Sequence, residues 1–222
     1  MAFNHLNIHN FPELKATTTE KGRRYRVGDS FYPSVTTVIG YSKKDAIVKW
    51  RKKVGEEEAN KISTRASIRG NKCHKLCELY LENKSISKYS DDPLSMGLFY
   101  QIKPYLDSIN NIHALESSLC SNVLKLAGRV DCIAEYKGEL AIIDFKTSTK
   151  EKREEWIHDS FAQETAYAIM FQELTGLMPK KLVTIIACET GTPQVFEIYD
   201  KFKYARKLKE YIDTYKGAYG EW

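Results

Sequence analysis

The sequence predicts an α/β fold in which helices flank a β-sheet. Apolar residues recur at helical spacing through residues 62–81, whereas residues 126–136 and 140–147 carry the apolar patterns of strands. The element order is helices, three strands, a helix, two strands and a helix, which is typical of a sheet with helices on its flanks. Because neither an internal repeat nor a linker-like segment divides the 222 residues, one domain spanning 1–222 is expected.

Composition is ordinary for a globular protein, with 42% hydrophobic and 28% charged residues. The net charge of +5 permits a polyanionic partner but does not require one. No apolar run approaches the roughly 20 residues of a membrane-spanning helix, and Met1–Lys15 shows no targeting pattern. The odd number of cysteines, five, favours free thiols in a reducing compartment, so a cytoplasmic location is expected.

Local signals place each element in turn. The expected elements are the strand Arg23–Val27, a short helix opening at Ser34, the helices Asp45–Asn60, Ile62–Leu81 and Pro93–Ile109, the strands Ala114–Asn122, Leu126–Tyr136 and Leu140–Thr147, the helix Phe161–Thr175, the strands Lys181–Cys188 and Gln194–Tyr199, and the helix Lys201–Tyr215.

Three positions in the N-terminal half carry more specific expectations. Ser34 is a candidate N-cap. Gly70 lies inside the longest helix, where glycine costs about 1 kcal/mol relative to alanine, so it is expected to allow close approach of another element. Pro104 is a possible break in its helix.

The stretch Gly128–Lys146 is predicted to be a β-hairpin with a turn at Lys137-Gly138. Because side chains alternate across a strand, Asp144 and Lys146 should share one face, with Phe145 turned into the core. Asp131 lies in the preceding strand. Ionised groups gathered by an apolar hairpin are costly unless they are paired or bound to a metal, so the hairpin predicts a metal site. A purely structural salt bridge between Asp144 and Lys146 is the alternative.

Four short motifs then follow one another along the chain. They are Gly70-x-x-x-His74, Gly128-x-x-Asp131, Asp144-x-Lys146 and Gln163-x-x-x-Tyr167. Together they resemble the RecB-like branch of the PD-(D/E)xK nuclease superfamily and, within it, the mitochondrial genome maintenance exonuclease and related phage exonucleases. The segment Pro33–Thr36 also fits that group.

The resemblance implies a restriction-endonuclease-like core, that is, a central mixed β-sheet flanked by helices. The N-terminal helical elaboration would span about 34–110, the catalytic core about 112–200 and the C-terminal helix 201–219. The implied location is the cytoplasm of a bacterium or of a phage-infected host cell.

The resemblance also implies a site built on oxygen ligands, which suit Mg²⁺ or Mn²⁺. Asp131, Asp144 and Lys146 would be catalytic. The implied metal ligands are His74, Asp131, Asp144 and the backbone carbonyl of Phe145, with Glu78 as a further candidate. Glu78 could equally be a surface carboxylate, and Glu116 could either support the site or face solvent.

Other metal centres are disfavoured. No iron–sulfur cluster is expected, because no cysteine follows Cys188. Zinc at Cys73 and Cys77 would lack enough ligands, and these side chains suit core packing equally well.

The implied function is metal-dependent exonucleolytic hydrolysis of DNA, of single strands from a free end, in replication, recombination or repair. The helices between Asp45 and Ile109 could form an arch that admits only a free end. Candidate DNA contacts are Gln163, Tyr167, Arg129, Ser34 and Thr36. Packing is the alternative for Tyr167, solvent exposure for Gln163 and helix capping for Ser34 and Thr36.

Two other functions stay open: a structure- or end-selective DNA endonuclease of the same fold, and a non-catalytic DNA-binding recombination partner. The expected partner is DNA, with replication or recombination proteins as further candidates. The protein is expected to be a monomer without membrane association.

Overall fold

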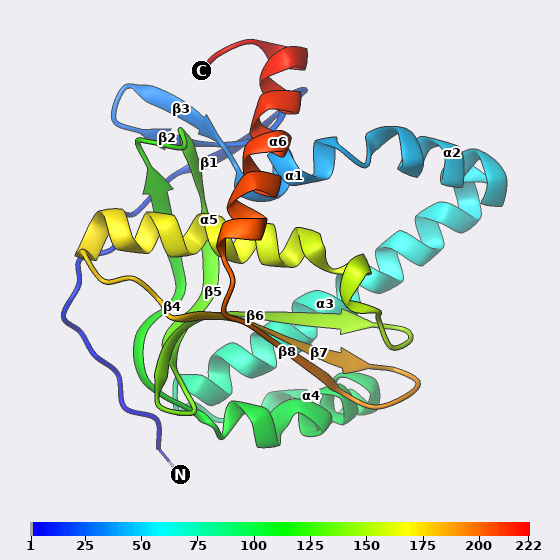
Figure 1. Ribbon diagram of the computed structural model, residues 1–222. Coiled ribbons are helices and arrows are strands. Elements are labelled where there is room, and N and C mark those ends of the chain that lie inside the picture. The colour runs from blue at the N-terminus through cyan, green and yellow to red at the C-terminus, as the bar shows by residue number, and fades with distance from the viewer. Residues whose placement is uncertain (1) are drawn as a thin grey trace.

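The computed structural model describes residues 2–222, apart from the side chain of Phe202. The described residues form two β-sheets and a set of helices (Figure 1). The strands are β1 (Ala16–Thr19), β2 (Gly22–Val27), β3 (Ser30–Pro33), β4 (Ile109–Ser121), β5 (Leu126–Tyr136), β6 (Glu139–Ser148), β7 (Lys181–Cys188) and β8 (Gln194–Ile198). The α-helices are α1 (Val35–Tyr41), α2 (Lys44–Val54), α3 (Glu56–Leu81), α4 (Pro93–Leu106), α5 (His158–Thr175) and α6 (Phe202–Tyr219), with 3₁₀ turns at Ser87–Tyr89 and Glu154–Trp156.

The central sheet has the strand order β4-β5-β6-β7-β8. Its β6 and β7 strands are parallel, and the other neighbouring strands are antiparallel. Parallel neighbours need a crossover connection, which α5 supplies between β6 and β7. The sheet is therefore mixed and flanked by helices, which confirms the predicted fold class.

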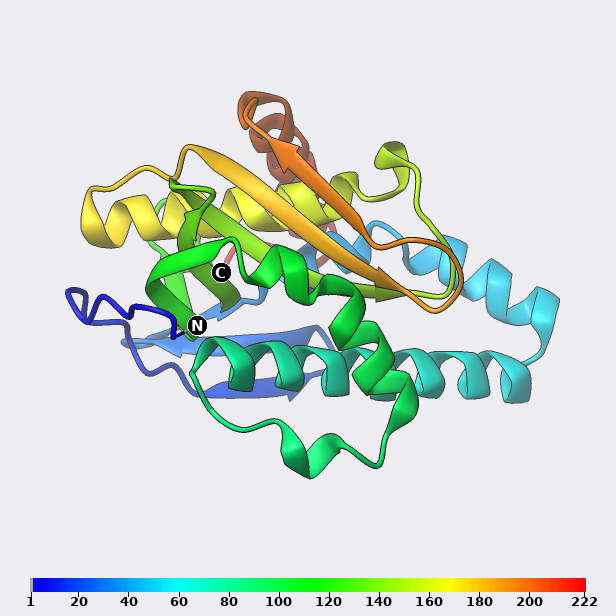
Figure 2. The same ribbon diagram turned by 90° about the horizontal axis from the view of Figure 1, so that it is seen from below.

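Helices cover both faces of the central sheet and bury a separate apolar core on each. Ile142 of β6 packs in the core that contains residues of α1, α5 and α6. Its neighbour Ile143 packs in the core formed with α3 and α4 (Figure 2). Because β6 is buried on both sides, its apolar run is nearly continuous, as in strands of parallel sheets. Strand β6 therefore leads from the buried interior of the sheet to Asp144 and Lys146.

A smaller antiparallel sheet, β1-β2-β3, precedes the helices. Of its strands only β2 was predicted, because β1 is a polar, fully exposed strand and β3 is only four residues long. The predicted N-cap is confirmed: the Ser34 hydroxyl accepts a hydrogen bond from the Thr37 amide at 3.0 Å. An isolated bridge between Ser34 and Ala127 joins this region to the start of β5.

Two predicted helix boundaries are wrong. The break between α2 and α3 falls at Gly55, whose φ of +89° lies in the left-handed region, rather than near residue 61. The helix α4 continues through Pro104 and ends at Leu106, because a proline two residues from the end removes little of the helical hydrogen bonding. None of the helices in residues 2–222 is long and apolar enough to cross a membrane.

Candidate active site

The β5–β6 ladder stops at the point where the two predicted acids stand. Pairing runs from Tyr136 opposite Glu139 to Cys132 opposite Ile143. At the next position a side chain, rather than the backbone of β5, binds β6: the Oδ2 atom of Asp131 accepts a hydrogen bond from the Phe145 amide at 3.0 Å. Asp131 is therefore fixed to the backbone one residue beyond Asp144.

Asp144 is 3% exposed and lies between Lys146 and Gln163. Its Oδ1 accepts hydrogen bonds from Lys146 Nζ at 2.6 Å and from Gln163 Nε2 at 3.1 Å. Lys146 Nζ is also 2.6 Å from Oδ2, so the ammonium group contacts both oxygens of the carboxylate. The predicted shared face of Asp144 and Lys146 is thus present in the structure.

Burial dominates the electrostatics of this pair. It raises the pKa of Asp144 to about 6; the Lys146 ammonium opposes this shift, and the charge of Asp131 adds to it. Burial lowers the pKa of Lys146, but the carboxylates of Asp144 and Asp131 outweigh it, so that the pKa of the lysine is raised. Asp144 therefore ionises near neutral pH while Lys146 keeps its proton.

A second group of ligand atoms lies beside this pair. His74 on α3, Glu116 on β4 and Asp131 on β5 each offer an atom within 4.8 Å of the others. His74 Nδ1 is 3.4 Å from Asp131 Oδ2. The pairing of β4 with β5 places Glu116 beside Asp131, and the packing of α3 against the sheet brings His74 to them.

Glu116 reaches this group through an unusual backbone conformation. Its φ is +48°, which is uncommon for a residue other than glycine and is found often at functional sites. Its Oε2 pairs with Arg129 Nε at 2.9 Å. Burial, helped by the charge of Asp131 and opposed by Arg129, raises the pKa of Glu116 to about 7.

These residues fit a divalent cation. Carboxylate oxygens and an imidazole nitrogen converge, and Asp144 adds a buried carboxylate beside them. The geometry differs from the expected ligand set in one respect: Glu116, rather than Asp144, lies in the compact group with His74 and Asp131. Phe145 lies in β6 opposite Ile185, with its ring in the core near His74.

The group opens into a cleft of about 550 Å³ between α3 and the β4–β5 strands. Glu78 lines this cleft, but its Oε1 is bonded to Lys75 Nζ at 2.6 Å. Within residues 2–222, Glu78 is not a member of the compact ligand group. The remaining lining residues are Ser67, Gly70, Asn71, His74, Lys75, Glu116, Arg129 and Asp131.

The predicted DNA contacts divide into exposed and buried residues. Arg129 has a 57% exposed side chain at the cleft, and Thr36 is exposed on α1. Gln163 binds Asp144 instead of facing solvent. Tyr167 is 3% exposed in the α5 core and Ser34 is 2% exposed as a helix cap, so for both residues the structure shows the packing or capping alternative.

One acid of this region was not predicted. Glu164 on α5 is fully buried, its Oε1 accepts a hydrogen bond from the Thr184 hydroxyl, and its Oε2 has no partner within the described chain. Burial and the charge of Asp144 raise its pKa well above the usual value. In the sequence, Glu164 falls at helical spacing with the apolar residues Phe161, Ala168 and Phe171, and this pattern predicts that the acid is buried.

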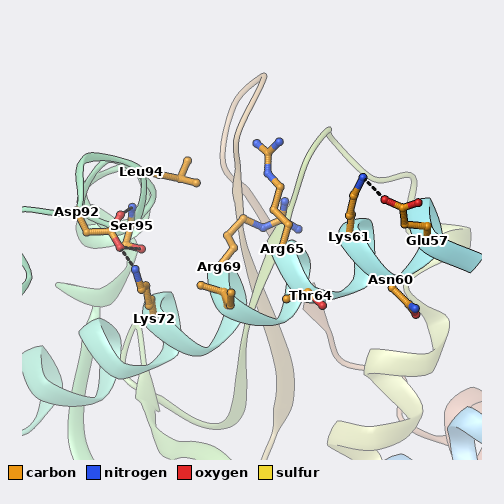
Figure 3. Close-up of a pocket in the computed structure, with 11 residues that line it drawn as sticks. Glu57, Asn60, Lys61, Thr64, Arg65, Arg69, Lys72, Asp92, Leu94 and Ser95 are labelled. Atoms are coloured by element: carbon orange, nitrogen blue, oxygen red, sulfur yellow. Dashed lines mark hydrogen bonds and ion pairs between the residues drawn. The ribbon is translucent and has the colours of Figure 1, made fainter.

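A larger groove of about 610 Å³ lies on the other side of α3 (Figure 3). Its cations are paired: Lys61 with Glu57 at 2.8 Å, Lys72 with Asp92, and Arg65 and Arg69 with Glu189 at 2.7 and 2.5 Å. Arg69 also donates to the Thr147 hydroxyl at 3.1 Å, one residue after Lys146. This contact fixes α3 to the end of β6.

Comparison with known proteins gives consistent results. Residues 43–215 match the family model of the PD-(D/E)XK nuclease superfamily. Mitochondrial genome maintenance exonuclease 1 from Homo sapiens is 30% identical over 129 residues, and its counterpart from Mus musculus is 29% identical over 128 residues. Each match covers 54% of this chain but only 38% of the relative.

A crystal structure from Eubacterium rectale, described as a candidate exonuclease, aligns with 64% of this chain and 62% of its own, at 11% identity and a TM-score of 0.45. That likeness is too low to support an argument about function. The family match covers most of the chain, and it includes all the residues that meet in the cleft. The chain therefore belongs to the PD-(D/E)XK nuclease superfamily.

Proposed function

We propose that this protein is a metal-dependent DNA exonuclease that hydrolyses single strands from a free end, in DNA replication, recombination or repair. The observation that carries the proposal is the meeting of Asp131, Asp144 and Lys146 at the end of one hairpin, beside His74 and Glu116. The names of the relatives support the exonuclease class.

Asp131, Asp144, His74 and Glu116 would hold the cation, with the Phe145 carbonyl as a further ligand. When bound, Mg²⁺ or Mn²⁺ would polarise the scissile phosphate and lower the pKa of a coordinated water. Gln163 supports this arrangement, because it donates a hydrogen bond to Oδ1 of Asp144 and so holds the carboxylate in place. Glu78 is the weaker candidate, since Lys75 already engages it.

Lys146 is the residue proposed to act on the phosphate itself. Its ammonium group is held 2.6 Å from Asp144 and its side chain remains 35% exposed, so it can reach a bound substrate. There it would orient the attacking water and offset the negative charge that grows on the phosphoryl oxygens. Arg129 and Thr36 remain proposed phosphate contacts, because both are exposed.

The requirement for a free end is proposed from the shape of the helical elaboration. The α2–α3 elbow at Gly55 projects from the body of the molecule (Figure 2), and α2 buries none of its described residues. The role proposed for this elbow is to admit a strand end first. The proposed compartment is reducing, as in cytoplasm, because all five cysteines are free and four are buried. The protein is proposed to act as a monomer.

Parallel digestion of linear and circular single-stranded DNA tests the proposal. We expect Mg²⁺- or Mn²⁺-dependent release of nucleotides from the linear strand, no loss of the circle, and no reaction in EDTA. Equal loss of the circle would identify an endonuclease instead. DNA binding without any hydrolysis in either metal would indicate a non-catalytic recombination partner.

A further inference from the structure

The catalytic cleft continues past Arg129 into a second groove. This groove, of about 450 Å³, shares Glu116 and Arg129 with the cleft and is otherwise lined by Phe11–Lys15, Ser117 and Ser118. A third hollow of about 360 Å³ shares Phe11 and Ser117 with the second. The three depressions therefore form one path from α3, across β4, to the N-terminal segment. We call the second hollow the N-terminal groove.

The wall of the N-terminal groove is held in place by hydrogen bonds. The Leu6 amide donates to the Ile112 carbonyl at 2.7 Å, which fixes the N-terminal segment along the edge strand β4. The Arg26 amide donates to the Lys15 carbonyl at 3.0 Å, which fixes the other end to β2. Between them, the ring of Phe11 lies parallel to that of Phe171, with centroids 6.4 Å apart.

The side chains of the N-terminal groove suit a single strand of nucleic acid. Lys15 is exposed, and no acid in residues 2–222 forms an ion pair with it, although Glu13 is close in sequence. Arg129 stands at the junction with the cleft, and Ser118 lies opposite it in the ladder. Cations that follow a backbone, combined with an aromatic ring on which a base can stack, are the usual elements of single-strand binding.

The groove on the far side of α3 lacks these properties. Lys61 and Lys72 are engaged by Glu57 and Asp92 (Figure 3). Arg65 and Arg69 are engaged by Glu189, and no aromatic residue lines this groove. It is larger, but a phosphate there would have to displace an existing carboxylate. Among the described residues, the N-terminal groove differs from it in one unpaired cation, Lys15, and in the Phe11 ring, since Arg129 is itself paired with Glu116 at 2.9 Å.

We propose that the N-terminal groove binds the nucleotides on one side of the scissile phosphate, with Lys15 on a phosphate and Phe11 against a base. This inference rests on the proposed nuclease function. It also defines the path of the strand over the protein: the DNA crosses His74 and Asp131 and is then held beyond Arg129.

Binding of a labelled oligothymidylate, followed by fluorescence anisotropy in EDTA, tests the role of Lys15. Lys15→Glu is compared with Lys61→Glu, which makes the same charge change in the groove beyond α3 and serves as the matched control. We expect the Kd to rise about tenfold for Lys15→Glu at low salt and less than about twofold for Lys61→Glu, because only the first removes a phosphate contact. Equal effects of the two variants, or no binding by the unchanged protein, would overturn the inference.

Photocrosslinking locates the strand independently. Oligonucleotides carrying 5-iododeoxyuridine at successive positions are irradiated with the protein, and crosslinked peptides are identified by mass spectrometry. We expect the peptide that contains Phe11 to be labelled from positions on one side of the bond that is cut. Labelling confined to Asn60–Lys72 of α3 would place the strand in the other groove and refute the inference.

The outcomes separate the two proposals. If the unchanged protein degrades DNA but Lys15→Glu binds it as tightly as Lys61→Glu does, the groove assignment fails and the nuclease function stands. If Lys15→Glu alone loses binding but no metal supports hydrolysis, the nuclease function fails and the groove remains a DNA-binding site.

Discussion

The hydroxyl oxygen of Tyr167 lies against Gly128, where an added β-carbon would stand 2.7 Å away. Tyr167 itself is buried in the α5 core. Two motifs that lie about forty residues apart in the sequence are thus in direct contact. Tyr167 packs under the start of β5, the strand that carries Asp131, and only glycine at 128 leaves room for it.

Replacing Gly128 by alanine should therefore destabilise the protein. Forcing an extra carbon into a packed core costs about 1–3 kcal/mol, so we expect a loss of this size for Gly128→Ala in urea unfolding. Gly70→Ala is the matched control. Its β-carbon would lie 3.7 Å from the Thr147 hydroxyl, an ordinary contact, and alanine favours a helix by about 1 kcal/mol. Equal losses in both variants would contradict this account.

Lys146→Ala should abolish cleavage while leaving DNA binding largely intact. The lysine supplies a positive charge at the phosphate, and removing one such group typically costs about 10²–10³ in kcat. Single-turnover cleavage of a labelled strand gives the rate, and anisotropy gives the affinity. Lys209→Ala, on the exposed surface of α6, is the control and should change neither. Near-normal turnover of Lys146→Ala would remove this residue from the mechanism.

Glu116 should contribute to cation binding as strongly as Asp131 does. Both acids lie in the compact group with His74, so Glu116→Gln and Asp131→Asn should each weaken Mn²⁺ binding by tenfold or more, on the order of one lost ligand. Calorimetric titration with Mn²⁺ measures the effect. Glu78→Gln is the control and should have a small effect, because Lys75 already engages Glu78. A large loss of Mn²⁺ affinity in Glu78→Gln alone would show that the cation binds nearer to Glu78, further along α3.

Cation binding should strengthen with pH. The metal-free protein has a pKa of about 7 at Glu116 and about 6 at Asp144, and both carboxyl groups must lose their protons to bind. The Mn²⁺ affinity should rise about tenfold between about pH 6 and 7, and more steeply below that range. Titrations across this range measure the slope, and Glu116→Gln should remove the upper step. A flat profile would show that neither proton competes.

The same shift has a consequence for stability. Since the folded-state pKa of Asp144 lies above its unfolded value, folding takes up a proton between the two values. The metal-free protein should therefore lose stability as the pH rises from about 4 to about 6, and Asp144→Asn should lessen this loss. Thermal unfolding in EDTA measures it. A rise in stability specific to Asp144 over this range would contradict the assignment.

The hairpin that carries Asp131, Asp144 and Lys146 could be predicted because its signals are local. Strand alternation alone places Asp144 and Lys146 on one face, and the structure shows them bonded to each other. The strand β7 matches its predicted bounds, since an apolar run between turns is unambiguous. The roles assigned to the site residues remain predictions.

Other features depend on contacts that a single sequence does not encode locally. The place of Glu116 depends on a positive φ within a strand, and that of Tyr167 on a neighbour about forty residues earlier. The polar strand β1 has no apolar pattern at all, because neither of its faces is buried. Gly55 marks the boundary between α2 and α3 in the sequence, but the charged residues on both sides of it resemble one continuous exposed helix.

The two grooves on opposite sides of α3 make this helix intolerant of changes in length. One residue more or fewer between Arg69 and His74 would turn everything beyond it by about 100° around the helix axis. If the C-terminal part of the helix turned, the His74 imidazole would no longer face Asp131. If the N-terminal part turned, the Arg69 guanidinium would lose its contacts with Thr147 and Glu189. Insertions and deletions should therefore be confined to the segments before and after α3.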